Sequence, residues 1–160
     1  MKVYKLQRTQ KLPISLETAW TFLCQPKNLQ QLTPPSINLT ITSDVPEHIY
    51  PGLIITYQLK IYKVFYFKWT TEITQSERLS YFIDEQRFGP YKFWHHEHRL
   101  QSIDGGVEIK DVVHYALPFG ILGRMVHFGW IRNQLDDIFD YRYDILDNQF
   151  PEGEQHSRTI

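Results

Sequence analysis

The sequence has few of the features that cross-link a protein or hold it in a membrane. Its 160 residues include one cysteine, Cys24, which excludes an internal disulfide and fits a reducing compartment. No run approaches the roughly 18 apolar residues of a membrane span, and the first residues lack the apolar stretch of a signal peptide. We therefore expect a cytoplasmic protein without a membrane span.

An excess of charge of one sign is also missing. Lys and Arg number 17 against 18 Asp and Glu, so the formal net charge is −1. Because this balance implies no basic face, we expect no nucleic-acid partner. The lone cysteine and the lack of an HExxH motif leave no specific metal signature, and we expect neither a metal nor a cofactor.

Aromatic residues are abundant. Ten Tyr, ten Phe and four Trp make up 15% of the chain, within a hydrophobic content of 42%. Each ring can bury roughly 150–250 Å², so together they can seal a core or line a pocket. The length suits one domain, which we place at residues 1–150, followed by a disordered tail at residues 151–160.

Alternation of apolar and polar residues predicts about seven antiparallel strands. We expect them at residues 4–12, 37–42, 53–61, 65–73, 79–88, 91–103 and 107–117. Two short helices should follow the first strand, at residues 16–23 and 28–32, with Ser15 as the N-cap of the first and Pro26 as its stop.

A long helix is predicted from Ile121 to Asp147, about 40 Å in length. Its apolar arc contains Phe128, Ile131, Leu135, Ile138, Phe139 and Leu146. Arg142 lies at the centre of this arc. Its guanidinium either extends toward solvent near the helix C-terminus, or is buried and paired with Asp111, Glu97 or a ligand anion. These elements predict an α+β fold, in which a curved sheet closed by the last helix encloses a volume.

The strongest hairpin signal is Asp104-Gly105. With this turn, the facing pairs are His98 with Asp111, His96 with Val113, and Trp94 with Tyr115, all on the inward face. A turn at Gly105-Gly106 would instead place Asp111 opposite Leu100. A three-residue loop would turn the histidines outward.

The inward His96, His98 and Asp111 have four interpretations. They form a polar ladder that orders the sheet, or the polar end of an apolar pocket that orients a ligand. They could also hold a metal, or form a catalytic dyad of His98 and Asp111, although no nucleophilic Ser or Cys is near. The nearby rings Trp69, Trp94, Phe128 and Phe139 are either plain core or the wall of that pocket.

Further motifs extend over nearly the whole chain: the segment from Asn28-Leu29 to Thr33-Pro34-Pro35, Gly89-Pro90, Phe93–Arg99, Gly105-Gly106, Asp111, Tyr115, Leu117–Gly120, Gly123 and Ile138–Arg142. This set resembles one branch of the SRPBCC superfamily, which includes START-like lipid carriers, major pollen allergens and polyketide cyclases. The resemblance implies a helix-grip fold, with a sheet wrapped around the C-terminal helix and a deep apolar cavity between them. In that branch a His-Glu-His run, an Asp on the next strand and a terminal Tyr-x-Arg recur together. They correspond here to His96-Glu97-His98, Asp111 and Tyr141-Arg142. Because the superfamily shares a scaffold and no single reaction, no substrate is implied.

We therefore expect a carrier or sensor that binds a small apolar molecule, such as a lipid, an isoprenoid or a polyketide-like compound. The expected ligand-binding residues are Trp69, Trp94, His96, His98, Asp111, Tyr115, Phe128, Leu135, Phe139 and Arg142. One alternative is a cyclase or dehydratase with His98 as general base and Asp111 orienting it. Another is an accessory protein-interaction domain with a collapsed cavity. A cavity above roughly 300 Å³ would favour ligand binding. The apolar segment Leu117–Gly123 is either a buried corner or a rim in transient membrane contact.

Overall fold

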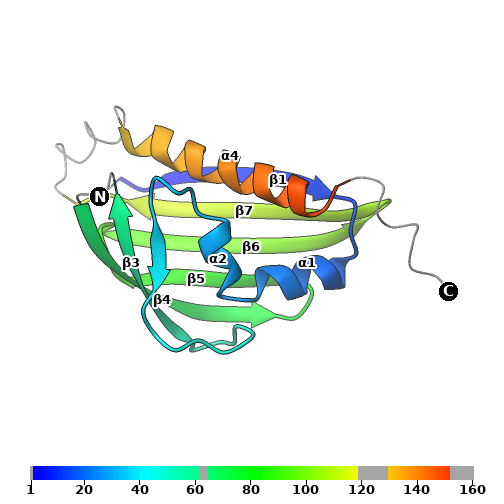
Figure 1. Cartoon of the computed structure of the whole chain (residues 1–160), viewed down its shortest axis with the longest axis horizontal. Helices are drawn as coiled ribbons and strands as arrows, with labels where there is room; N and C mark the ends of the chain where they lie inside the picture. The colour runs from blue at the N-terminus through cyan, green and yellow to red at the C-terminus, as the bar shows by residue number, and fades with distance from the viewer. Residues whose placement is uncertain (1, 62–64, 119–129, 152–160) are drawn as a thin grey trace.

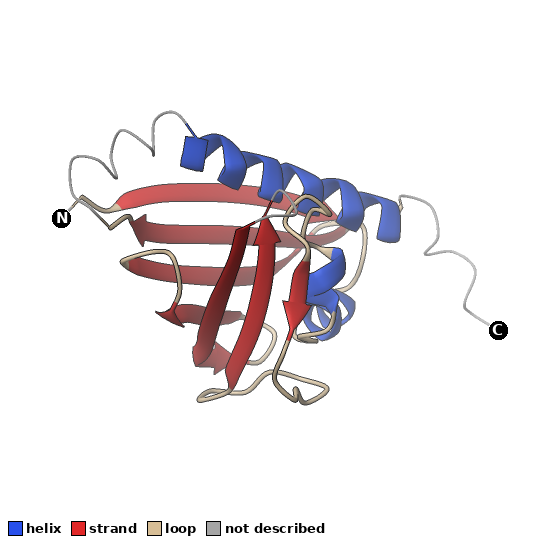
Figure 2. Ribbon diagram, turned by 60° about the vertical axis from the view of Figure 1, so that its left-hand side comes forward, coloured by secondary structure: helices blue, strands red, loops and turns tan. Residues whose placement is uncertain are grey.

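The computed structural model describes residues 2–61, 65–118 and 130–151. Within them, seven strands form one antiparallel sheet in the spatial order β1-β7-β6-β5-β4-β3-β2. The strands are β1 (Tyr4–Leu12), β2 (Leu39–Ile41), β3 (Ile54–Ile61), β4 (Phe65–Glu77), β5 (Tyr81–Phe88), β6 (Phe93–Ile103) and β7 (Gly106–Ala116). The sheet is strongly curved, because the strands at its β2 end run across those at its β1 end (Figures 1 and 2).

The helices lie on one side of this sheet. Helices α1 (Leu16–Leu23) and α2 (Asn28–Gln31) follow β1, and α4 (Arg132–Gln149) follows β7. Figure 1 shows α4 running along β1 and β7, with α1 and α2 below its C-terminal half. The buried face of α4 carries Leu135, Phe139, Arg142 and Leu146. The curved sheet and α4 therefore face each other across an interior space.

The hairpin between β6 and β7 has the register that the two-residue turn predicts. His98 pairs with Asp111, and Trp94 pairs with Tyr115. Gly105 in the turn has a φ of +78°, a conformation that glycine adopts without strain. The prediction that His96, His98 and Asp111 share the inward face is confirmed, since all three are buried.

The predicted fold class is confirmed: an α+β fold with a curved seven-stranded antiparallel sheet, two short helices after β1 and a long C-terminal helix. The helix ends at Gln149, two residues beyond the predicted end. The predicted first turns from Ile121, with Phe128 and most of Leu117–Gly123, lie outside the described residues, as does the tail at residues 152–160.

Two strand predictions need correction. The second strand spans only Leu39–Ile41, because Asn38 adopts a positive φ of +37° that interrupts an extended chain. The fourth strand continues to Glu77, beyond its predicted end at Ile73, with irregular pairing to β5 along the way. None of the described helices combines the length and apolar character needed to cross a membrane.

Candidate functional site

A cavity of about 230 Å³ lies between the concave face of the sheet, α2 and α4. Its wall is mostly apolar, with side chains from β3 to β6 and from the first half of α4. Members of this wall include Ile55, Tyr57, Leu59, Trp69, Ile73 and Leu135. The volume is smaller than the roughly 300 Å³ at which pockets for drug-sized ligands begin. It is larger than a cavity of about 150 Å³ that admits benzene.

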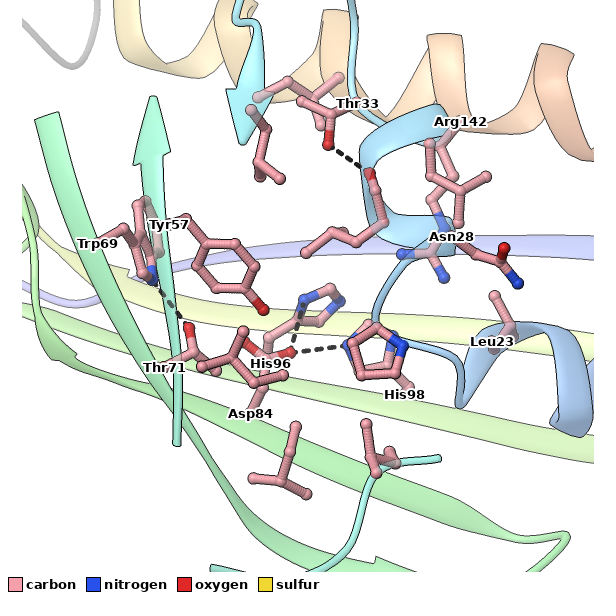
Figure 3. Close-up of a pocket in the computed structure, with 18 of the residues that line it drawn as sticks. Leu23, Asn28, Thr33, Tyr57, Trp69, Thr71, Asp84, His96, His98 and Arg142 are labelled. Atoms are coloured by element: carbon pink, nitrogen blue, oxygen red, sulfur yellow. Dashed lines mark hydrogen bonds and ion pairs between the residues drawn. The ribbon is translucent and has the colours of Figure 1, made fainter. Parts of the chain in front are cut away.

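Five polar side chains gather at one side of this cavity, and we call them the His–Asp–Arg cluster: Asp84 of β5, His96 and His98 of β6, Asp111 of β7 and Arg142 of α4. The register places Asp84 opposite His96 and His98 opposite Asp111. Figure 3 shows Asp84 beside the two histidines, with Arg142 on the side of α4. Three strands and one helix therefore contribute to a single group of charges.

Each imidazole in the cluster lies between two carboxylates. His96 Nε2 lies 3.0 Å from Asp111 Oδ1, and its Nδ1 lies 3.4 Å from Asp84 Oδ2. His98 Nε2 lies 2.8 Å from Asp84 Oδ2. His98 Nδ1 lies 2.9 Å from Asp111 Oδ1, but the ring is not oriented for a hydrogen bond, and this nitrogen has no hydrogen-bond partner among the described residues. The two rings are 3.7 Å apart between centroids, so the pair forms one tight unit.

Burial and neighbouring charges act in opposite directions on these groups. Burial alone would raise the pKa of Asp111, but Arg142 and the two histidines outweigh it and hold that pKa well below its ordinary value. The pKa of Asp84 is likewise lowered, since His96 and His98 outweigh its burial. Burial and the charge of His98 lower the pKa of His96. Burial opposes protonation of His98 too, yet the two carboxylates raise its pKa. The cluster therefore favours two ionised carboxylates and a proton on His98.

Arg142 is buried at the edge of the cavity. The residue is 6% exposed, and its Nη1 lies 3.5 Å from Asp111 Oδ1. Among the described residues its Nε finds no hydrogen-bond partner. Of the two predicted roles, the buried guanidinium paired with Asp111 is confirmed. Glu97 lies on the other face of β6, where it pairs with Arg99. A buried cation with a spare donor can receive an oxygen atom of a ligand.

Most of the sequence-predicted site residues come together around this cavity. Those that line it are Trp69, Trp94, His96, His98, Leu135, Phe139 and Arg142. Asp111 lies behind the two histidines, with 1% exposure, and so reaches the cavity only through them. Tyr115 is not among the lining residues, because its ring packs on Tyr4 at 5.6 Å. Phe128 lies outside the described residues.

Sequence reasoning missed Asp84, which completes the cluster. It also missed Phe82, whose ring stacks on His98 with centroids 4.1 Å apart, and Tyr91, which lines the cavity. The sequence contains one indication of the position of Asp84, the turn residues Gly89-Pro90. A turn there pairs β5 with β6 and brings Asp84 opposite His96, as the register has it.

Comparison with known proteins identifies the fold of the chain. No protein-family model and no curated protein matches the sequence. Among solved structures, a protein from Arthrobacter aurescens matches at a TM-score of 0.68 and 10% identity, over 98% of this chain and 93% of its own. Protein Ms6760 from Mycobacterium smegmatis matches at a TM-score of 0.64 and 16% identity, over 93% of this chain and 98% of its own. Ara h 8.0201, which has the Bet v 1-like helix-grip fold, matches at a TM-score of 0.62 and 13% identity, over 92% of this chain and 99% of its own.

The chain has a helix-grip fold. The helix around which the sheet wraps is α4. The cavity lies between α4 and the concave face of the sheet. The fold that the SRPBCC resemblance implied is thus confirmed. At these identities the solved structures indicate the fold alone, and membership of that superfamily stays a prediction.

Proposed function

We propose that the protein binds a small apolar molecule that carries one polar or anionic oxygen group, and acts as its carrier or sensor. The observation that carries this proposal is the distribution of polarity in the cavity. Apolar side chains form most of the wall, while the His–Asp–Arg cluster is confined to one side. Such a cavity gives affinity through apolar burial, at about 25 cal/mol per Å², and orientation through a few polar groups.

The cavity volume limits which part of a ligand is enclosed. About 230 Å³ suits a body of one or two rings or a short branched chain. A lipid, an isoprenoid or a polyketide-like compound fits if this part is buried and the remainder stays outside the cavity. The SRPBCC resemblance and the helix-grip fold are compatible with such a ligand. Arg142, with its spare Nε donor, is the side chain that we assign to the ligand oxygen.

The test uses 5-(dimethylamino)naphthalene-1-sulfonate, a fluorescent probe with a two-ring apolar body and an anionic group. The matched variants are Ile55→Trp, which fills the cavity, and Ile54→Trp, which adds the same ring on the opposite face of β3. Ile55 is 2% exposed and lines the cavity, whereas Ile54 is 45% exposed. We expect Ile55→Trp to weaken probe binding at least about tenfold, and Ile54→Trp to leave it within about twofold.

Equal probe binding by the two folded variants would contradict the proposal, since the probe would then bind elsewhere. Circular dichroism checks that each variant is folded, and Leu59→Phe is a milder substitution that also fills the cavity. Native mass spectrometry of the protein purified from its source is the complementary measurement. A co-purified mass that the Ile55→Trp variant lacks would name the ligand class.

One observation favours a second candidate, an acid–base enzyme such as a cyclase or dehydratase. His98 lines the cavity and lies between Asp84 and Asp111, which raise its pKa and favour its protonated form. Such an imidazolium can donate a proton to a leaving hydroxyl. If a co-purified compound is converted by the wild type, His98→Gln should abolish the conversion and retain most of the affinity. Conversion at the wild-type rate by this variant would exclude the role.

A further inference from the structure

We infer that Asp84, His96 and His98 form a binding site for a divalent first-row transition-metal ion, of the class that imidazole ligands select. The sequence offered His96, His98 and Asp111 as a possible set, and we expected no metal. The structure changes the set, because Asp84 from the neighbouring strand faces the same space as the two histidines. Each of the three residues offers one ligand atom, and these atoms lie within 4.8 Å of one another.

The spacing of these atoms is close to what an ion requires. Asp84 Oδ2 lies 2.8 Å from His98 Nε2 and 3.4 Å from His96 Nδ1. Imidazole nitrogen and carboxylate oxygen bind Zn²⁺ at about 2.0–2.2 Å, so neighbouring ligand atoms are roughly 3.0–3.5 Å apart at tetrahedral or octahedral angles. The third spacing, between the two ring nitrogens, is within 4.8 Å, so the side chains must rotate to bring all three atoms around one ion.

The outer nitrogens of both rings face one shared carboxylate. Asp111 Oδ1 accepts a hydrogen bond from His96 Nε2, and it lies 2.9 Å from His98 Nδ1. A proton on His96 Nε2 leaves the Nδ1 lone pair free on the side of Asp84. Metal-binding histidines usually give their second nitrogen to a carboxylate in this way, which fixes the ring and its tautomer. Arg142, 3.5 Å from Asp111, supports that carboxylate in turn.

The charge and the position of the site indicate what else the ion would bind. An ion that binds His98 displaces the proton that the cluster favours there, because a ligating imidazole is neutral. With both rings neutral, the two carboxylates and Arg142 leave the cluster with one net negative charge. A divalent ion makes the cluster net positive by one charge, which an anionic oxygen offsets. Asp84, His96 and His98 all line the cavity, so an open coordination position would face it. Three protein ligands with an open position are typical of metal sites that bind a substrate or water.

The opposite face of the sheet provides a comparison. His95 on β6 pairs with Glu85 at 2.7 Å, and its ring lies 6.4 Å from that of His114 on β7. These groups are half-exposed, and among the described residues only Asp84, His96 and His98 meet the spacing for a three-ligand site. His95 and His114 are therefore matched controls for histidine number and strand.

This inference goes beyond the proposed function and is tested apart from it. Binding of the fluorescent probe depends on the apolar cavity and Arg142, and binding of a metal ion depends on the three ligands. Either property can be present without the other. If the metal titration shows no binding, the proposal of a small-molecule ligand is therefore unaffected. If Ile55→Trp and Ile54→Trp bind the probe equally, the inferred metal site is unaffected.

The experiment titrates the full chain, freed of metal with a chelator, with CoCl₂ followed by visible absorption and with ZnCl₂ followed by calorimetry. We expect one ion per chain, cobalt bands with a nitrogen and oxygen ligand field, and no binding of Mg²⁺. Asp84→Asn and His98→Gln should each weaken Zn²⁺ binding at least about a hundredfold, and Asp111→Asn about 10–100-fold. His95→Gln and His114→Gln should leave it unchanged.

Absence of Co²⁺ and Zn²⁺ binding to the wild type would overturn the inference, and that measurement does not depend on whether any variant folds. So would unchanged affinity in a folded His98→Gln variant. A loss confined to His95→Gln and His114→Gln would also overturn it, because the ion would then lie on the outer face.

Discussion

The two halves of α4 cover differently filled parts of the interior. Figure 1 shows α1 below the C-terminal half. There, side chains of α1, β6, β7 and α4 pack into one buried cluster. The buried residues of this filled half are Leu12, Ile14, Ala19, Leu100, Val107, Ile109 and Leu146, and Leu32 lies at its border with the cavity. Below the first half none of the described helices lies in this way, and Leu135, Ile138 and Phe139 line the cavity.

Both halves combine aliphatic and aromatic side chains. In the filled half, aliphatic side chains from α1, β6, β7 and α4 form one buried cluster. In the hollow half, some rings of the wall meet edge to face, as Trp69 meets Trp94 at 88° and Tyr91 at 60°. The polar cluster lies at the border between the halves, where Arg142 leaves α4.

The largest effect is expected at this border. Asp111→Ala should lower the free energy of unfolding by about 3–5 kcal/mol, because it leaves the buried Arg142 without its carboxylate. Glu97→Ala, on the outer face of β6 beside the half-exposed Arg99, should cost less than about 1 kcal/mol. Urea unfolding measures both. A cost below about 1 kcal/mol for Asp111→Ala would mean that water from the hollow half already solvates Arg142.

A pair of leucine truncations on α4 compares the halves directly. Leu146→Ala should cost about 4 kcal/mol, since neighbours in the filled half cannot collapse onto the void. Leu135→Ala should cost nearer to about 2 kcal/mol, because the lost side chain borders a space that solvent or a ligand can occupy. Both residues are at most 2% exposed, so burial does not separate them. Equal losses in urea unfolding would contradict the distinction between the halves.

The fold could be predicted because its signals are local and periodic. Alternation placed the strands, Asp104-Gly105 set the register of β6 and β7, and the helical arc placed Arg142 on the buried face of α4. Together these signals brought His98, Asp111 and Arg142 to one place from the sequence alone.

The missing parts of the site depend on features without such periodicity. Asp84 lies on β5, whose pairing with β4 shifts register twice, so alternation along β5 does not give its inward direction and only the Gly89-Pro90 turn indicates it. Tyr115 faces inward as predicted, but Tyr4 of β1 covers its ring. The cavity volume depends on the rotamers of many rings, and a sequence pattern specifies none of them.

The smallest change in the free energy of unfolding is expected for a substitution beside the cavity. Leu59→Phe adds carbon atoms beside the cavity and should change the free energy of unfolding by less than about 0.5 kcal/mol. Val107→Leu adds a single methylene in the filled half, at a residue with no exposure, and should cost about 1–3 kcal/mol. Urea unfolding compares the two, and probe titration shows whether the ring added by Leu59→Phe takes up space that the ligand would use. If the larger insertion at Leu59 costs more than the smaller one at Val107, the cavity is too shallow to hold the apolar body of a ligand. The proposed carrier role would then lose its physical basis, while the metal site, which depends on three side chains alone, would remain open to its own test.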